Sequence, residues 1–487
     1  MTFVSDLEPR PLWQHFDAIL AIPRPSKHEE RARRYVLDEA EKRGLRWRQD
    51  ATGNVVVEKP ASPGKEGAPV VVIQGHLDMV TEKNSGTVHD FERDPIVPRR
   101  EGEWVKATGT TLGADNGIGA AAMLAVMTAD DLVHGPLELL FTVDEETGLT
   151  GVLALDPKAI ALSGRRLLNL DSEEEGAVTI GCAGGSASHL TLALETAPAP
   201  TGATALDVKL SGLKGGHSGM EIHLQRGNAV KLLARALLAA LQQTPFHLAA
   251  FQGGNKHNAL PREATARVVV PADARNAFAA AVERETAAIQ DEIRTADPDL
   301  KIEIAEAPAA ERVWTPAASR KALDLLNALP HGVQAMSNDI PSLVETSLNV
   351  ATATSTDGAL SILISIRSSV ASAMRDTKRR LRAIAELAGA EVVETEGYSG
   401  WKPNPASPLL GRFQQVHQRL TGKDAELRAV HAGLECGVLG EKFRGMDMIS
   451  FGPVIQGAHS PDERVEVESV GRFWGLLKEV LAELADG

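Results

Sequence analysis

Five stretches of the sequence carry imidazole or carboxylate side chains of the kind that bind metal ions. They are GHLDMV with His76 and Asp78, TTLGADNG with Asp115, FTVDEETG with Glu145 and Glu146, LLNLDSEEEG with Asp171, and QGAHSPDERV with His459. Each stretch alone also fits a structural role, such as a histidine-aspartate hydrogen bond, a turn or a helix cap. Because these groups lie just after apolar strand-like runs or in adjoining loops, we expect them to cluster at one end of a sheet.

The charges of such a cluster predict a particular chemistry. Two neutral imidazoles and three carboxylates carry a charge of about −3, which two divalent cations and a hydroxide would bring close to zero. That balance is typical of a two-metal hydrolase in which one carboxylate bridges the metals. Nitrogen and oxygen ligands without a thiolate favour zinc, with manganese and cobalt as alternatives.

Two carboxylates remain outside this ligand set. Glu145, beside the ligand Glu146, is free to act as a general base. Asp78 lies two residues beyond His76 and can accept the proton on the ring nitrogen that does not face the metal. By contrast, Glu173, Glu174 and Glu175 are interpreted as a solvated charge run.

The segments GHLDMV, GADNGIGAA, DEETG, NLDSEEEG, GGHSG and AHSPDE resemble, in the same order, the signature segments of the M20 family of co-catalytic zinc metallopeptidases. GLKGGHSGMEI, HAGLECG and GAHSPDERV are most similar to its aminoacyl-histidine dipeptidase branch, also called Xaa-His dipeptidase or carnosinase. The resemblance implies that one zinc ion is held by His76, Asp115 and Asp171, and the other by Asp115, Glu146 and His459. It implies that Asp115 bridges, that Glu145 is the general base and that Asp78 orients His76. An aspartate at position 171 favours a dipeptidase within this family.

Further residues are candidates for substrate binding. His217 in KGGHSG could lie in a merely flexible glycine-rich turn, whereas the resemblance implies an oxyanion donor. Arg367, at the end of SILISIR, could simply place charge at a sheet edge, but it resembles the arginine that grips the substrate carboxylate. Asn258 in GGNKHNALP resembles a family asparagine, and Glu435 in HAGLECG is a candidate for the substrate amino group.

The elements that position these residues follow two different sequence patterns. Strands at GNVVVEKP, PVVVIQ, PLELLFTV and RRLLNLD, with a small-residue helix at NGIGAAAMLAVMTA, predict a doubly wound α/β domain. The resemblance implies that this is a catalytic domain of the zinc-peptidase type. Ser26-Lys27-His28-Glu29 has the form of a capping box that opens a helix ending near Gly44. The helix LLGRFQQVHQRLTG and the strand MDMISFG resume the α/β pattern near the end of the chain.

Between these parts the pattern changes to that of an inserted α+β domain, which resembles the lid domain of the M20 family. It contains two strand-helix-strand half-units, from ARVVVPA to KIEIAEA and from SILISIR to EVVETE. We therefore predict a catalytic domain formed by residues 1–182 and 400–487, with the lid formed by residues 183–399. A lid of this length predicts an active site that is complete within one chain, and the chain is expected to be a monomer or a homodimer.

The composition restricts the classes of partner and the cellular compartment. The chain has 487 residues, a formal net charge of −14 and two cysteines. The negative net charge argues against binding to nucleic acids or anionic membranes, and the two cysteines fit a reducing compartment. We find no signal peptide or membrane span and expect a cytoplasmic enzyme.

The predicted function is hydrolysis of small dipeptides of the Xaa-His type, such as carnosine, at two divalent metal ions. One alternative is a deacylase of the same family that acts on N-acyl amino acids. The other is a catalytically inactive homologue that binds metal or peptide, although the intact Glu145 argues against it because binding needs no spare base.

Overall fold

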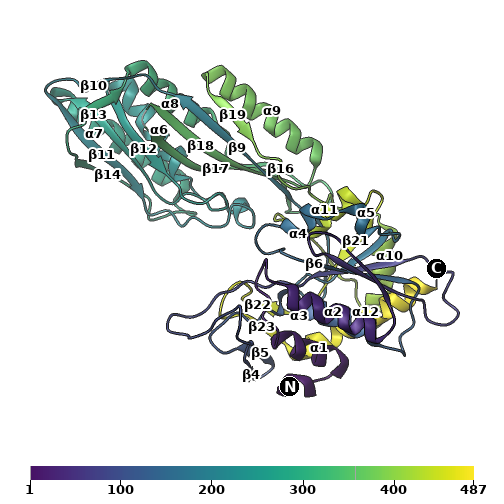
Figure 1. Cartoon of the computed structure of the whole chain (residues 1–487). Coiled ribbons are helices and arrows are strands. Elements are labelled where there is room, and N and C mark those ends of the chain that lie inside the picture. The colour runs from purple at the N-terminus through teal and green to yellow at the C-terminus, as the bar shows by residue number, and fades with distance from the viewer. Residues whose placement is uncertain (1, 357, 487) are drawn as a thin grey trace. The chain divides into compact units, whose positions relative to one another are not determined.

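The computed structural model describes residues 2–356 and 358–486, and its chain forms two compact units (Figure 1). The first unit contains Met1–Cys182, Trp401–Ala429 and Gly433–Gly487, and the second contains Ala183–Gly400 and Val430–Ala432. The second unit is thus inserted into the sequence of the first. Where the chain leaves and re-enters the first unit, Cys182 and Trp401 exchange two backbone hydrogen bonds of 2.9 Å.

The first unit is built on a mixed eight-stranded sheet. In spatial order its strands are β1 (Arg46–Gln49), β2 (Val55–Lys59), β6 (Leu137–Thr142), β3 (Val71–His76), β7 (Arg166–Asn169), β21 (Asp447–Ser450), β8 (Ala177–Cys182) and β20 (Glu426–Val430). The central strands β6, β3, β7 and β21 are parallel, whereas β2 and β8 run antiparallel to their neighbours. The four strands predicted in the first third of the sequence are confirmed as β2, β3, β6 and β7.

Apolar residues explain why the central strands form. All six residues of β3 and all six of β6 are buried, as expected for strands covered on both faces. The helices of this unit are α1 (Arg10–Leu20), α2 (Glu30–Lys42), α3 (Ala114–Thr128), α4 (Thr150–Ala154), α5 (Pro157–Ile160), α10 (Pro408–Thr421), α11 (Glu435–Lys442) and α12 (Val467–Ala485), with a short 3-10 helix at Phe3–Asp6. A small antiparallel sheet joins β22 (Ile455–Gln456), β23 (Arg464–Glu466), β5 (Trp104–Ala107) and β4 (Pro98–Glu101).

The predicted capping box at Ser26 to Glu29 is wrong. Helix α2 begins at Glu30, and its N-cap Glu29 makes no side-chain cap. The Ser26 hydroxyl instead donates to Asp78, and the Glu29 carboxylate accepts from the backbone N–H of Asp144. These tertiary hydrogen bonds, with one from the backbone N–H of Lys27 to Glu29, take the place of the reciprocal bonds of a capping box. The end of the helix agrees with the prediction, since Gly44 follows it with a φ of 65°.

The second unit is an antiparallel sheet with helices. Its strand order is β14 (Lys301–Glu306), β11 (Ala203–Ser211), β13 (Ala264–Pro271), β12 (His247–Gly253), β17 (Val344–Thr356), β18 (Ala359–Ser368), β9 (Gly184–Ala193) and β19 (Glu391–Glu394), and β16 (Gly332–Met336) also pairs with β17. The helices are α6 (Ala229–Gln243), α7 (Arg275–Ile293), α8 (Pro316–Ala328) and α9 (Ala371–Ala388), with 3-10 turns at Ile222–Leu224 and Ala272–Ala274. Two short strands, β10 (Thr196–Pro198) and β15 (Arg312–Trp314), form a separate pair.

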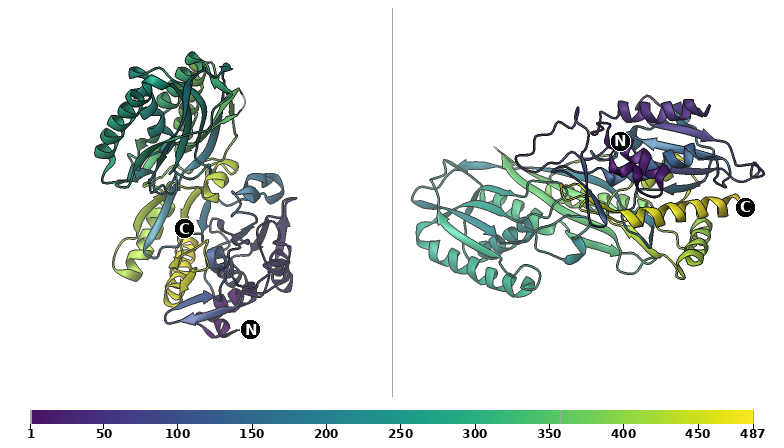
Figure 2. Two further views of the ribbon diagram at one scale, coloured as in Figure 1. Left: turned by 90° about the vertical axis from the view of Figure 1, so that its left-hand side faces the viewer. Right: turned by 90° about the horizontal axis from the view of Figure 1, so that it is seen from below.

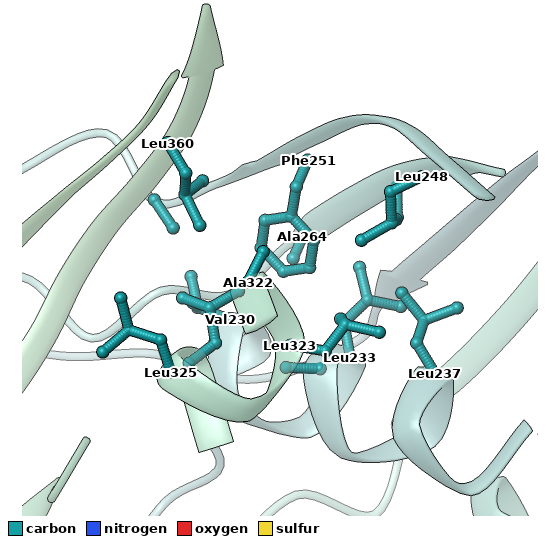
Figure 3. Close-up of a cluster of buried hydrophobic side chains, with 14 of the residues drawn as sticks. Val230, Leu233, Leu237, Leu248, Phe251, Ala264, Ala322, Leu323, Leu325 and Leu360 are labelled. Atoms are coloured by element: carbon teal, nitrogen blue, oxygen red, sulfur yellow. The ribbon is translucent and has the colours of Figure 1, made fainter. Parts of the chain in front are cut away.

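The core of the second unit lies between this sheet and its helices. Figure 2 shows the helices gathered on one side of the sheet, and residues from all four contribute to one buried cluster. In the close-up, α6 presents Leu233 and Leu237 and α8 presents Leu323 toward Phe251 of β12 (Figure 3). The amphipathic pattern of α6 therefore determines which side it buries. In the described residues of both units, no helix has the length and apolarity needed to cross a bilayer.

Candidate metal centre and substrate-binding residues

The predicted ligands gather at the carboxyl ends of the parallel strands. His76 is the last residue of β3, and in the parallel register it lies opposite Thr142, the last residue of β6. Glu145 and Glu146 follow β6, and Asp171 follows β7. Asp115 lies in the first turn of α3, where the backbone departs from helical geometry. His459 comes from the loop between β22 and β23.

The five predicted ligands form two groups that share Asp115. Nε2 of His76 lies 3.2 Å from Oδ1 of Asp115 and 3.4 Å from Asp171. Nε2 of His459 lies 3.3 Å from Oδ2 of Asp115 and 3.1 Å from Glu146. Each group brings its donor atoms within 4.8 Å of one another, close enough to hold one ion. The two oxygens of Asp115 thus face different groups, as a bridging carboxylate requires.

Asp78 connects the end of β3 with the turn after β6. One of its carboxylate oxygens lies 3.2 Å from Nδ1 of His76. The carboxylate also accepts hydrogen bonds from the backbone N–H groups of Glu145 and Glu146, at 3.0 and 3.2 Å. Asp78 thus lies beside His76 and holds the backbone of the Glu145–Glu146 turn.

Two buried residues that the sequence reasoning did not select hold the Asp115 loop. Glu463 accepts four backbone hydrogen bonds of 2.7 to 3.2 Å, from Leu112 to Asp115. Arg24 donates to the backbone carbonyls of Leu77 and Asp78 and to that of Gly113. Glu463 lies within the quoted segment AHSPDE, four residues after His459, and that position was its only signal in the sequence.

The carboxylates of the centre favour positive charge on the groups next to them. Although burial alone lowers it, the pKa of His76 is raised well above its usual range by Asp171, Asp115 and Asp78. Hydrogen bonds to Asp115 and Glu146 raise the pKa of His459 to about 11. Burial raises the pKa of Asp171 to about 7. The carboxylates therefore draw protons onto both imidazoles, and divalent cations would satisfy the same demand after displacing those protons.

These donors fit a pair of divalent metal ions. The set consists of imidazole nitrogens and carboxylate oxygens, and Oε1 of the ligand Glu146 is a buried oxygen without a hydrogen-bond partner. A third group, formed by His76, Glu145 and Glu146, overlaps the first two. A fourth, formed by Glu29, Asp78 and Asp144, was not predicted, and its members already accept hydrogen bonds from the surrounding chain.

Glu145 and Glu435 are both buried carboxyl groups next to the centre. Burial, together with the charges of Asp171, Glu146 and Glu435, raises the pKa of Glu145 well above its usual range. Glu435 is fully buried, and one of its oxygens accepts hydrogen bonds from Gln74 and Thr142. Its other oxygen has no partner. Burial raises the pKa of Glu435 to about 8.

The charge run after Asp171 differs from its interpretation as merely solvated. Glu174 forms an ion pair with Arg428 at 3.1 Å. Glu175 makes a two-pronged contact with Arg472 of α12. These pairs fix the loop that follows Asp171, and such contacts across the sequence could not be read from a run of like charges.

In the second unit, His217, Asn258 and Arg367 occupy neighbouring segments. Nδ1 of His217 accepts a hydrogen bond of 2.9 Å from the backbone N–H of Met220, so the ring proton of the neutral imidazole is on Nε2. Burial, with the nearby charge of Arg367, lowers the pKa of His217. The backbone carbonyl of Asn258 accepts from Ser218 at 2.8 Å, which ties its segment to the His217 loop.

Arg367 is a buried cation without a carboxylate partner. Its side chain is 9% exposed, and NH1 lies 3.5 Å from the hydroxyl of Tyr398. Its Nε is buried without a hydrogen-bond partner. Among the described residues, no carboxylate forms an ion pair with its guanidinium. A buried charge is normally paired, so this geometry is suited to an anionic group supplied by a ligand.

The chain is similar to several known proteins. The family model for peptidase family M20/M25/M40 matches residues 72–483. The cytosol non-specific dipeptidase of Escherichia coli is 43% identical over 485 residues, which cover 99% of each chain. The crystal structure of aminoacylhistidine dipeptidase from Vibrio alginolyticus superposes with a TM-score of 0.92 at 42% identity, covering 99% of this chain and 98% of that one. Aminopeptidase PepT from Bacillus cereus shares the fold, with a TM-score of 0.59 at 16% identity over 98% of this chain and 99% of that one.

Proposed function

Because the chain belongs to peptidase family M20/M25/M40, we propose that it hydrolyses dipeptides at a centre of two divalent metal ions. The chain is a metallopeptidase hydrolase with the mixed α/β fold of this family, as the sequence segments predicted. The observation that carries the two-metal proposal is the position of Asp115, whose two oxygens face the group with His76 and the group with His459. Zinc is the proposed metal, with manganese and cobalt as alternatives that the same donors accept.

The ligands divide as the two groups suggest. His76 and Asp171 would hold one ion, Glu146 and His459 the other, and Asp115 both. When bound, divalent cations at such a centre polarise the scissile carbonyl and make a water molecule easier to deprotonate. Asp78 keeps Nε2 of His76 available for this role through its contact with Nδ1.

Glu145 is proposed as the group that moves the proton. It would take a proton from the attacking water onto its carboxylate and pass it to the nitrogen of the leaving amine. Its burial, which favours the protonated form, suits a residue that must hold a proton between these two steps. The backbone N–H of Glu145 donates to Asp78, which fixes the main chain from which this carboxylate projects.

Four further residues are proposed to bind the substrate, namely His217, Asn258 and Arg367 of the second unit and Glu435 of the first. The proton on Nε2 of His217 would be donated to the oxyanion that forms at the scissile carbonyl. Arg367 would hold the terminal carboxylate with two parallel hydrogen bonds. Asn258 and Glu435 remain proposed contacts of the substrate, the latter for the free amino group through its unpartnered oxygen.

The relatives support a dipeptide substrate. One is named a cytosol non-specific dipeptidase and the other an aminoacylhistidine dipeptidase. We propose that this chain acts on dipeptides that include Xaa-His compounds such as carnosine. The name of the Escherichia coli relative also supports action in the cytosol.

The test is a substrate panel assayed with metal-depleted protein to which zinc, manganese or cobalt is returned. It compares a free dipeptide, its N-acetylated form and its C-terminal amide. We expect metal-dependent hydrolysis of the free dipeptide and poor hydrolysis of both blocked forms. A preference for the N-acetylated compound would favour the deacylase, and no metal-dependent turnover on any dipeptide would favour the inactive homologue.

The role of Arg367 is tested with the same panel. Losing a charged, partly desolvated interaction costs about 2–5 kcal/mol, so Arg367→Ala should lower kcat/KM for free dipeptides by tens to thousands of fold. The amidated dipeptide lacks the carboxylate, so its hydrolysis should change little. Equal losses on the two substrates would contradict the carboxylate clamp.

A further inference from the structure

Three residues far from the rest of the second unit in sequence complete the surroundings of Arg367. Val430–Ala432 belongs to the second unit, although the residues on both sides of it belong to the first. The backbone N–H of Ala183 lies 3.0 Å from the carbonyl oxygen of Val430 and 2.9 Å from that of Ala432. These two contacts hold His431, the middle residue of the segment, against the rest of the second unit.

His431 contacts the strand that pairs with the strand of Arg367 and also contacts the loop of His217. Nε2 of its ring lies 2.7 Å from the hydroxyl of Ser347. Ser347 on β17 is the register partner of Arg367 on β18. The carbonyl oxygen of His431 abuts Gly219 in the His217 loop, where an added Cβ would lie 2.4 Å from that oxygen and 3.0 Å from Nε of Arg367. His431 thus lies between the strand of Arg367 and the loop of His217.

The imidazole of His431 is uncharged in this position. The side chain is 6% exposed, and burial, with the nearby charge of Arg367, lowers the pKa of His431 to about 3. A carboxylate at the same place would be attracted to the guanidinium and would occupy it. A neutral hydrogen-bonding side chain instead fills the space and leaves the charge of Arg367 unpaired.

We propose that His431 is a positioning residue that fixes Arg367 and the His217 loop while keeping the guanidinium free for the terminal carboxylate of the substrate. The inference rests on the proposed function, since it assigns a further residue to the same carboxylate site. His431 acts through its neighbours and takes no part in the proton transfers.

Two nearly isosteric variants separate charge from shape. In His431→Asn the side chain stays neutral, whereas in His431→Asp it brings a negative charge next to Arg367. KM and kcat are measured for a free dipeptide such as Ala-His and for its C-terminal amide. We expect His431→Asp to raise KM for the free dipeptide about 10- to 100-fold more than His431→Asn does. The two variants should hydrolyse the amide equally.

Further variants control for a structural role. Ser347→Ala removes the hydroxyl that contacts Nε2 and should raise KM for the free dipeptide, with a smaller effect on kcat. His417→Asn changes a buried histidine of α10, whose Nδ1 contacts the carbonyl of Lys423, and should not distinguish the two substrates. Equal losses on both substrates for His431→Asp and His431→Asn would overturn the proposal.

Arg367→Ala in the same series separates two kinds of failure. If Arg367→Ala is selective for the free dipeptide but the His431 variants are not, the role of His431 is wrong and the clamp stands. If Arg367→Ala also affects both substrates equally, the carboxylate clamp of the proposed function fails together with it.

Discussion

At the scale of single residues, neighbouring carboxylates of one type are assigned different tasks by their contacts. Glu146 lies 3.1 Å from His459 and faces the metal group. Glu145, one residue earlier, belongs to neither of the two groups that share Asp115. The proposed roles of Glu146 as a ligand and Glu145 as a base therefore rest on the different contacts of two side chains from one turn, whose backbone N–H groups both donate to Asp78.

Substitutions at Glu145 and Asp115 should have opposite effects on metal content. Glu145→Ala should abolish turnover while two metal ions remain bound, because the proposed base is not a ligand. Asp115→Ala should lose metal, because both groups lose a donor. Metal analysis of the purified variants by mass spectrometry measures the content. Loss of a full equivalent from Glu145→Ala would instead favour the overlapping group in which Glu145 is a ligand.

At the scale of elements, the Asp115 loop depends on a carboxylate more than 300 residues away. Glu463 holds four consecutive backbone N–H groups from Leu112 to Asp115 and is 2% exposed. Without these contacts the N–H groups at the start of α3 would be buried and unpaired. The loop between β22 and β23, which also supplies His459, is thus a structural support for the bridging ligand.

The variant Glu463→Gln should weaken metal binding without removing a ligand. An amide keeps one acceptor oxygen but turns an N–H donor toward the backbone donors of the loop. Losing support of this kind typically lowers metal affinity by about 10- to 100-fold. Titration of metal-depleted protein with zinc measures the affinity. Glu468→Gln, an exposed position on α12, serves as the matched control and should leave the affinity unchanged. Equal affinities for the two variants would contradict the role of Glu463.

Elements with a strong local pattern could be predicted from the sequence, and elements set by distant contacts could not. The buried strands β3 and β6 and the amphipathic helix α6 were clear because their apolar periodicity is local. The capping box failed because Ser26 and Glu29 form hydrogen bonds with Asp78 and Asp144 instead. The proposed ligands could be selected because each lies in a recognisable segment of the sequence. Glu463 and His431 were not selected because the roles proposed for them depend only on tertiary contacts.

At the scale of the whole molecule, two partly buried histidines favour the neutral form. Burial lowers the pKa of His15 in the first unit and of His331 in the second to about 4 each. Nδ1 of His331 accepts from the side-chain amide of Asn228, and both nitrogens of His15 contact hydroxyl groups. In the unfolded chain these residues take up protons near pH 6.5.

The contribution of His15 and His331 to the free energy of unfolding should therefore fall as pH drops from about 6.5 to 4. At these two positions the unfolded chain binds more protons than the folded one over this range, so each histidine removes up to about 1–3 kcal/mol at the acid end. Denaturant unfolding of metal-free protein at several pH values measures the trend. His331→Gln should flatten it, whereas His28→Gln, at an exposed position, should not. An unchanged slope in His331→Gln would contradict this origin.

The active site is expected to be complete within one chain. Mixing His217→Ala protein with Glu145→Ala protein should then give no recovery of dipeptidase activity, because each chain lacks one needed group. The wild-type protein mixed with either variant is the control for subunit exchange. Recovery of activity in the mixture would mean that His217 of one chain serves the site of another.

The position of β21 in the first sheet has a consequence for how the protein is made. β7 and β8 are synthesised before the second unit, yet the strand that lies between them begins only at Asp447. At usual translation rates the ribosome needs about 15–50 s to travel from Cys182 to that strand. During this interval β7 and β8 lack the strand that pairs with both of them, and their unpaired edges are prone to wrong pairing and aggregation. The strands of the antiparallel insertion, β9 to β19, are complete by Glu394. The insertion can therefore begin to fold on the ribosome before β21, the last strand in sequence of the eight-stranded sheet, has been synthesised.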